Sequence, residues 1–205
     1  TWLGEDYAQV FDDEGQKMLD ILQRRTGHMS ELIDGILSYS RAVQSKQEYH
    51  EADMNRVTDE VISGLVVPEH IKIEIENILP TLSGNIIGIK QVMQNLISNS
   101  IKFMDKDQGL IQISAEDREQ DWLFSVRDNG PGIDVDHHEK IFQIFQRLEG
   151  AQHTEGTGIG LTVVKKIVDK WGGTIQVESV PGNGCTFYFT IPRPEDIQNT
   201  LSTIL

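Results

Sequence analysis

Apolar residues recur at helical spacing over a long stretch near the start of the chain. Between Gln16 and about Ala42 they alternate steps of three and four, which is the heptad seam of a bundle or coiled-coil helix. The seam comprises Leu19, Leu22, Thr26, Met29, Ile33, Ile36 and Ser40, flanked by Met18, Arg25 and Leu32. Because such a helix cannot bury its stripe alone, we expect it to pack against a preceding helix that ends in Thr1–Val10, and against a second copy of the chain. The alternative is a helix packed on its own globular domain.

After a polar hinge at Arg41–Glu48 the pattern becomes that of mixed helices and strands. It predicts helices at Met54–Leu65 with Asp53 as cap, Gln91–Met104, around Lys140–Phe145, and Ile159–Trp171. It predicts strands at Ile71–Ile75, Leu110–Ala115, Trp122–Val126, Thr174–Ser179 and Thr186–Ile191. Phe11–Gly15 is predicted as a polar turn, Pro80–Gly84 as a loop, and Arg147–Thr157 as a mobile segment. This order indicates an α+β fold.

Polar side chains on the helix at Gln91–Met104 are the first candidates for a site. Asn95 and Asn99 are four residues apart and therefore share one face, and Lys102 lies three residues further on. Unpartnered polar groups on a buried helix are costly, so these side chains suggest a ligand. A solvated polar face explains them equally well, and the glycine motifs that follow decide between the two readings.

Two glycine-rich segments follow predicted strands or begin predicted helices. In Asp128–Ile133, DNGPGI, the glycines allow close approach to a flat ligand, and the aspartate can accept from an amino group. In Gly156–Leu161, GTGIGL, three glycines and a helix N-terminus together suit phosphate. Taken alone, the first could be an ordinary Asn-Gly turn and the second is a weak signal. Neither is a Walker loop.

Two further segments carry weaker signals. Gly182 and Gly184 read as a hairpin turn, although Thr186 beyond them could line a base pocket. Phe142 and Phe145 are three residues apart in IFQIFQRL, where we expect both to anchor a lid against the core, with Arg147 reaching a phosphate.

Composition limits the possible classes of function. The apolar fraction of 38% and charged fraction of 24% are those of an ordinary globular protein. A formal net charge of −14 argues against a general nucleic-acid or anionic-membrane surface. Cys185 is the one cysteine, which excludes an internal disulfide. The single cysteine favours a reducing, cytoplasmic setting. Since no apolar run is long enough to span a membrane, we expect no direct membrane contact from this chain, and a membrane anchor elsewhere in the full-length protein stays an open alternative.

Taken together, the motifs resemble the ATP-binding domain of sensor histidine kinases. They match that family's N box (Asn95, Asn99, Lys102, Phe103), first G box (Asp128, Gly130, Gly132), F box (Phe142, Phe145) and second G box (Gly156, Gly158, Gly160). Gly182–Phe187 matches the looser third glycine element. The segment at 32–41 is similar to the second helix of the family's dimerisation and phosphotransfer hairpin, most of all in phytochrome-like and PAS-linked kinases. The resemblance implies a two-layer sandwich, a mixed sheet covered by helices, at 46–194, after a partial hairpin at 1–45 and before a tail at 195–205.

The resemblance also implies roles for individual residues. Asn99 would ligate Mg²⁺ with Asn95 beside it, and Lys102 would neutralise phosphate charge. Asp128 would read the adenine amino group, and Phe103 would flank the base. The other implied nucleotide-binding residues are Gly130, Gly132, Ile133, Arg147, Gly156, Thr157, Gly158, Ile159, Gly160, Leu161 and Thr186. Ser100, where the family usually has Ala, and Cys185, where Ser is common, are near-isosteric departures that we expect to matter little.

One residue separates kinases from hydrolytic relatives in the wider superfamily. Those relatives place a water-activating Glu four residues before the metal-binding Asn, and here that position is Asn95, which cannot act as a general base. We therefore expect transfer of the ATP γ-phosphoryl group to a histidine, then to an aspartate of a response-regulator receiver domain, in a homodimer formed through the hairpin. None of the six histidines is a convincing acceptor, so the acceptor is expected upstream. The alternatives are a hydrolytic clamp ATPase and a catalytically silent dimeric scaffold.

Overall fold

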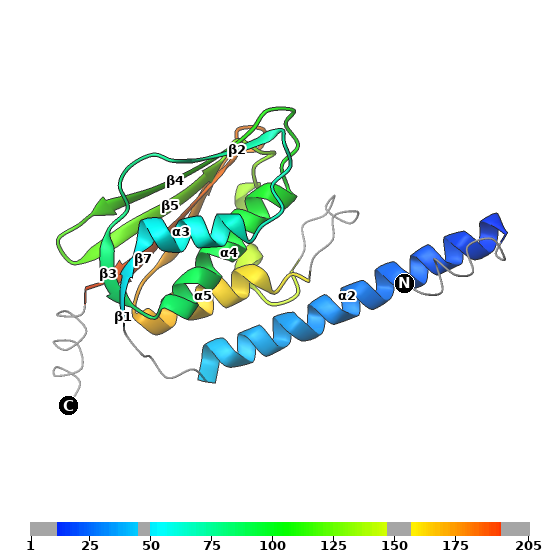
Figure 1. The fold of residues 1–205 in the computed structure, drawn as a ribbon, viewed down its shortest axis with the longest axis horizontal. Coiled ribbons are helices and arrows are strands. Elements are labelled where there is room, and N and C mark those ends of the chain that lie inside the picture. The colour runs from blue at the N-terminus through cyan, green and yellow to red at the C-terminus, as the bar shows by residue number, and fades with distance from the viewer. Residues whose placement is uncertain (1–11, 45–49, 147–156, 194–205) are drawn as a thin grey trace.

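The computed structural model describes residues 12–44, 50–146 and 157–193. A long helix, α2 (Asp13–Gln44), precedes a unit in which helices lie against a five-stranded sheet (Figure 1). The helices of this unit are α3 (Met54–Ser63), α4 (Ile86–Lys102) and α5 (Gly160–Trp171), with the short 3₁₀ helices η1 (Val135–His137) and η2 (Lys140–Phe142). The α+β architecture predicted from the sequence is confirmed.

The main sheet is mixed, as predicted. Its strands lie in the order β2 (Ile71–Ile75), β4 (Gly109–Asp117), β5 (Asp121–Asp128), β7 (Cys185–Pro192) and β6 (Ile175–Ser179). β2 and β4 are parallel, and the other neighbours are antiparallel. Since β5 and β7 lie next to each other in the sheet, Asp128 at the end of β5 lies opposite Cys185 at the start of β7.

The core lies between this sheet and helices α4 and α5. Alternate strand residues are buried, as a sheet with one covered face requires: Ile111, Ile113, Phe124, Val126, Phe187 and Phe189. Phe124 and Phe189 stack with ring centroids 5.1 Å apart. The helices contribute Val92, Leu96 and Ile97 from α4 and Val164 and Val168 from α5, all fully or almost fully buried. This packing fixes the polar side of α4 relative to the end of β5.

Two elements differ from the prediction in ways that local chemistry explains, and one predicted helix cap agrees with the structure. α4 begins at Ile86 rather than Gln91 because the Asn85 side chain caps it, accepting from the Gly88 amide at 2.9 Å. α2 begins at Asp13, so the predicted polar turn is largely its first turn; the Gly15 amide donates to Asp12 at 2.8 Å. The predicted cap at Asp53 is confirmed, since its carboxylate accepts from the Asn55 amide at 2.9 Å.

The predicted loop at Pro80–Gly84 is wrong. Thr81–Gly84 forms strand β3, which pairs antiparallel with β1 (His50–Asp53) in a separate two-stranded sheet. Both strands are four residues long and gain their ladder from a partner about thirty residues away, which a local pattern does not reveal. The helix predicted around Lys140–Phe145 is likewise shorter, since the 3₁₀ turn η2 ends at Phe142.

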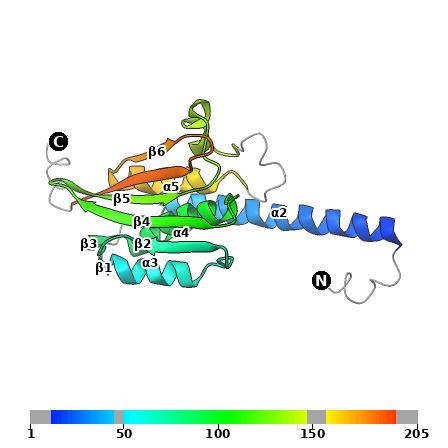
Figure 2. The ribbon, with the colours of Figure 1, turned by 90° about the horizontal axis from the view of Figure 1, so that it is seen from above.

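Helix α2 contacts the rest of the molecule through one flank. In Figures 1 and 2 its C-terminal half runs beside α5, and its N-terminal half projects beyond the sheet. Gly35 faces Ile159: a Cβ there would lie 2.8 Å from Ile159 Cδ1, and Leu32 packs against the core. The seam itself is exposed at Leu22 (61%), Met29 (60%) and Ile33 (56%). The helix thus packs on its own domain along one flank and leaves the predicted seam uncovered in a single chain.

Two predictions concern parts of the chain that are not seen here. Thr1–Val10 and most of the predicted mobile segment at Arg147–Thr157 lie outside the described residues. Within the part that is described, no helix is long and apolar enough to cross a membrane.

Candidate functional site

Helix α4 places the carboxamides of Asn95 and Asn99 one turn apart, and both side chains are half-buried. The Asn95 Nδ2 donates to the carbonyl of Gln91 at 2.7 Å, which fixes the orientation of that amide. Its Oδ1 then faces Gly160, where a Cβ would lie only 2.7 Å away. The structure therefore brings the predicted asparagine pair next to the glycine-rich start of α5, and any side chain at Gly160 would displace the Asn95 amide.

Asp128 ends β5 on the face of the sheet that α4 covers, and it is only 8% exposed. Its Oδ1 accepts from the Gly130 amide at 2.9 Å, and its Oδ2 accepts from the Ser100 hydroxyl at 3.0 Å. Burial raises the pKa of this carboxyl above its ordinary value, whereas hydrogen bonds from Gly130, Ser100 and the Cys185 backbone oppose the rise. Asp128 is therefore a preset acceptor for a donor that enters the pocket.

The segment after Asp128 packs tightly against the turn between β6 and β7. Gly132 has a φ of +72°, and a Cβ there would lie 2.3 Å from the Val180 carbonyl oxygen. The Gly182 amide donates to the Pro131 carbonyl at 2.6 Å, and the Ile133 amide donates to Ser179 Oγ at 2.7 Å. The first and third glycine elements thus interlock, so Gly132 serves backbone packing in the structure.

The second glycine motif lies where α5 begins. Gly158 has a φ of +69° and accepts from the Phe145 amide at 3.1 Å, and Thr157 Oγ1 accepts from the Ile159 amide at 3.3 Å. The side chain of Ile159 is 1% exposed, and Leu161 packs against the core. For Ile159, only the backbone is therefore placed to meet a ligand. Arg147 and Gly156 lie outside the described residues.

The aromatic pair of the predicted lid divides into one packed and one exposed ring. Phe142 meets Phe187 edge to face, with centroids 6.4 Å apart. Phe145 is 54% exposed and has a φ of +64°, so the prediction that it anchors against the core is wrong for the described part of the chain. At the end of α4, Lys102 Nζ lies 5.1 Å from the centroid of the Phe103 ring, which is itself 41% exposed.

The prediction that Thr186 lines the base pocket is wrong. Along β7 the buried residues Cys185, Phe187 and Phe189 alternate with Thr186 and Tyr188, so the Thr186 side chain points to the opposite face of the sheet. Cys185, opposite Asp128 in the register, is the residue that shares its face. Sequence reasoning also missed Ser100 as a partner of Asp128. The alternation of Phe187 and Phe189 could have shown that Thr186 faces away from the pocket. No local pattern shows that Ser100 is a partner of Asp128.

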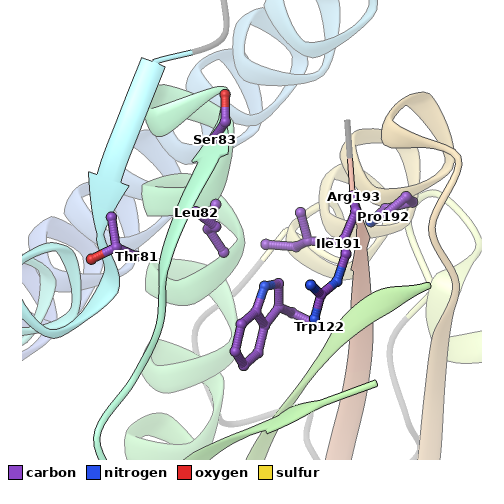
Figure 3. Close-up of a pocket in the computed structure, with 7 residues that line it drawn as sticks. All are labelled: Thr81, Leu82, Ser83, Trp122, Ile191, Pro192 and Arg193. Atoms are coloured by element: carbon purple, nitrogen blue, oxygen red, sulfur yellow. The ribbon is translucent and has the colours of Figure 1, made fainter. Parts of the chain in front are cut away.

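A cavity of about 320 Å³ lies at the other end of β5, between the two sheets. Figure 3 shows Leu82, Trp122 and Ile191 directed into it. Arg193 lies over the Trp122 ring at 5.4 Å and pairs with Asp117. Trp122 and Asp128 are six residues apart on one strand, about 20 Å, and no predicted nucleotide-binding residue lines this cavity. It is therefore separate from the candidate site.

The polar side chains of the candidate site could hold a metal ion only if a bound substrate supplied further oxygen ligands. The described ranges contain no group of three or more His, Cys, Asp or Glu side chains able to hold a metal ion. Mg²⁺ commonly binds through one or two protein oxygens and completes its shell with substrate phosphates and water. The Asn99 carboxamide fits that kind of site and does not fit a cage made only of protein ligands.

Comparisons with known proteins agree with this geometry. Over 196 residues the chain is 40% identical to Cyanobacterial phytochrome B of Nostoc sp. strain PCC 7120, covering 93% of this chain and 26% of the relative. The catalytic domain of histidine kinase ThkA superposes with a TM-score of 0.59 at 32% identity, over 71% of this chain and 96% of that one. The complex of histidine kinase ThkA with response regulator protein TrrA gives a TM-score of 0.67 at 27% identity, over 94% and 56%.

These matches also show how much of a larger protein the chain resembles. It spans about a quarter of the length of the first curated relatives, all three of which are cyanobacterial phytochromes or phytochrome-like proteins. Residues 84–195, more than half of the chain, match the family described as "Histidine kinase-, DNA gyrase B-, and HSP90-like ATPase". The chain therefore belongs to this family.

Proposed function

We propose that this chain is the ATP-binding catalytic region of a sensor histidine kinase. In this proposal it transfers the γ-phosphoryl group of ATP to a histidine, from which the group passes to an aspartate on a response-regulator receiver domain. The observation that carries the proposal is that α4 connects both ends of one site. Asn95 on α4 meets Gly160 at the start of α5, and Ser100, five residues further along, bonds Asp128 at the end of β5.

Each residue has a role that its surroundings support. The buried Asp128 carboxylate accepts from the adenine amino group, and the exposed Phe103 ring flanks the base. Asn99 would hold Mg²⁺, which when bound would supply positive charge at the phosphates, and Lys102 adds a further positive charge. Backbone amides of Gly158 to Leu161, at the N-terminus of α5, bind phosphate oxygens. Gly130 and Ile133 hold the loop beside Asp128, and Arg147, Gly156 and Thr157 remain predicted phosphate contacts.

Asn95 favours a kinase over a hydrolytic ATPase. Its carboxamide cannot remove a proton from water, and its nitrogen already donates to the Gln91 carbonyl. The phosphoryl group therefore awaits a nucleophile from another protein segment. The exposed seam of α2, at Leu22, Met29 and Ile33, supports assembly with a second helical hairpin. A silent scaffold would not need a buried carboxylate with both oxygens held by donors.

Phosphotransfer in trans tests the proposal. The chain is mixed with Mg²⁺, γ-labelled ATP and a separate helical hairpin that carries a phosphoacceptor histidine. We expect acid-labile label on the hairpin, little release of inorganic phosphate, and neither when Asn99→Ala replaces the wild type. Steady phosphate release without labelled hairpin would favour the clamp ATPase, and absence of ATP binding would favour the scaffold.

A further inference from the structure

Ser100 forms an unusual contact for a buried residue of α4. It is 4% exposed, and Asp128, its partner, is 8% exposed. Its hydroxyl donates to Asp128 Oδ2 at 3.0 Å, which links the last turn of α4 to the end of β5. Among the described residues, these two account for half of the four buried polar side chains, the others being Thr58 and Thr190. The Ser100 hydroxyl and the Asp128 carboxylate thus form a buried pair inside the proposed base pocket.

The hydrogen bonds that Asp128 accepts from Gly130 and Ser100 act on different oxygens. Gly130 donates to Oδ1 at 2.9 Å, and Ser100 donates to Oδ2 at 3.0 Å. A single bond would leave the carboxylate free to rotate about its last torsion, which is broad for aspartate. Donors at both oxygens fix the plane of the group. The Gly130 bond comes from the backbone, so Ser100 is the partner that a side-chain substitution can remove.

We infer that Ser100 is a positioning residue for base selection: its hydroxyl fixes the orientation of the Asp128 carboxylate as a hydrogen-bond acceptor, so that the pocket accepts a purine with an amino group and rejects one with a carbonyl at that position. An ionised carboxylate only accepts hydrogen bonds, whereas a protonated carboxyl can donate to a carbonyl oxygen. Adenine offers the amino group, and hypoxanthine offers the carbonyl. This inference rests on the proposed nucleotide function.

The charges around Asp128 set the sign of its pH dependence. From α4 the facing group is the Ser100 hydroxyl, and from the segment after α4 it is the Asp105 carboxylate, whose charge raises the pKa of Asp128. From β7 it is Cys185, whose thiol burial raises its pKa to about 12 and keeps it neutral. Burial and Asp105 thus favour the protonated carboxyl, and Ser100 opposes them. Removing the Ser100 hydroxyl should raise the pKa of Asp128. As the solution is acidified, ATP affinity that depends on the ionised Asp128 carboxylate should therefore be lost at a higher pH than in the wild type.

The test compares Ser100→Ala with Ser98→Ala, a half-buried serine on the same helix. Calorimetry measures ATP and inosine triphosphate binding between about pH 5 and pH 8. For Ser100→Ala we expect about a tenfold loss of ATP affinity and a smaller ratio of ATP affinity to inosine triphosphate affinity. We also expect a higher midpoint for the loss of ATP affinity with falling pH. Ser98→Ala should match the wild type. Ser100→Cys, which fills the same space with a weak donor, should shift the ratio in the same direction and less.

The outcomes separate the inference from the function on which it rests. If the wild type binds no ATP, the nucleotide function and the inference both fail. If the wild type binds ATP and neither variant at Ser100 alters the nucleotide ratio or the pH midpoint, the inference alone is overturned. Equal losses for both nucleotides with an unchanged midpoint would show that Ser100 only packs, and would also overturn it. Thermal unfolding of each variant identifies any that fail to fold, and in that case Ser100→Cys decides.

Discussion

The base end and the phosphate end of the proposed site are built from different kinds of contact. At the base end, Asp128 is buried and both of its oxygens accept hydrogen bonds, from Gly130 and Ser100. At the phosphate end, Asn95 and Asn99 are half-buried, and the Asn95 amide lies so close to Gly160 that a Cβ there would be 2.7 Å from its Oδ1. In the proposed function the base end therefore reads its ligand with one preset side chain, whereas the phosphate end depends on a close backbone approach at Gly160, on backbone amides and on a metal. Changes at one end should leave the other largely intact.

The largest effect is expected from Asn99→Ala. Removing the proposed metal ligand takes away charge stabilisation that matters most during transfer, and losses of about 10²–10³-fold in rate are typical of such groups. Transfer to a hairpin in trans measures the rate, and adenosine binding by calorimetry serves as the control for the base end. Unchanged transfer would contradict the metal-binding role of Asn99, and an equal loss of adenosine affinity would show that the two ends are not separate.

Asp128→Ala should act at the opposite end. A hydrogen bond to a charged group is worth roughly 1.5–3 kcal/mol, which corresponds to about 10- to 150-fold in affinity. We expect that loss for ATP, ADP and adenosine alike, measured by calorimetry, with binding of inorganic triphosphate unchanged. Because the wild-type carboxylate is buried, the alanine variant also frees Ser100 and Gly130 from their acceptor, and circular dichroism checks the fold. Equal weakening of bare triphosphate contradicts base reading by Asp128.

Gly160→Ala tests whether the phosphate end depends on the close approach of the Asn95 amide to the backbone of Gly160. The added Cβ would lie 2.7 Å from Asn95 Oδ1, which forces the amide to move. Since the amide is the end of a side chain, we expect a loss of about tenfold in ATP affinity with adenosine affinity retained. Gly27→Ala on α2, where a Cβ meets nothing within 4 Å, is the matched control. A loss of adenosine binding as well would place Gly160 nearer the base.

Gly35→Ala should have the smallest effect. Its Cβ would lie 2.8 Å from Ile159 Cδ1, one residue before α5 begins, so α2 must shift slightly relative to the phosphate end. We expect a melting temperature lower by a few degrees and a change of about twofold in ATP affinity, with adenosine unaffected. Differential scanning calorimetry and titration measure the two quantities. A stabilised protein would indicate that α2 packs against α5 less closely.

The sequence predicted those parts of the fold that local periodicity determines. β2 at Ile71–Ile75 and α5 from Gly160 lie where the pattern places them, because alternating and helical spacing are local properties. The β1–β3 pair was missed because its hydrogen bonds come from a distant segment. For the site, the motif resemblance singled out Asn95 and Asp128, which the structure joins to Gly160 and Ser100 respectively.

Packing explains what the sequence did not show about the site. Thr186 was assigned to the pocket although a strand turns neighbouring residues to opposite faces, and Cys185 takes that face instead. Ser100 was expected to matter little, since one extra oxygen in place of a methyl hydrogen hardly changes volume. Its hydroxyl nevertheless meets the Asp128 carboxylate, a partner 28 residues away that only the folded chain brings near.

Calorimetric titration of the whole chain with ATP, with and without Mg²⁺, tests most directly whether one site joins both ends. For the wild type we predict that Mg²⁺ strengthens ATP binding. Asn99→Ala should lose this strengthening by Mg²⁺ and keep its affinity for adenosine. Asp128→Ala should bind ATP and adenosine more weakly, and Mg²⁺ should still strengthen its ATP binding. A gain from Mg²⁺ that survives in Asn99→Ala, or ATP affinity that is the same in Asp128→Ala as in the wild type, would contradict the account.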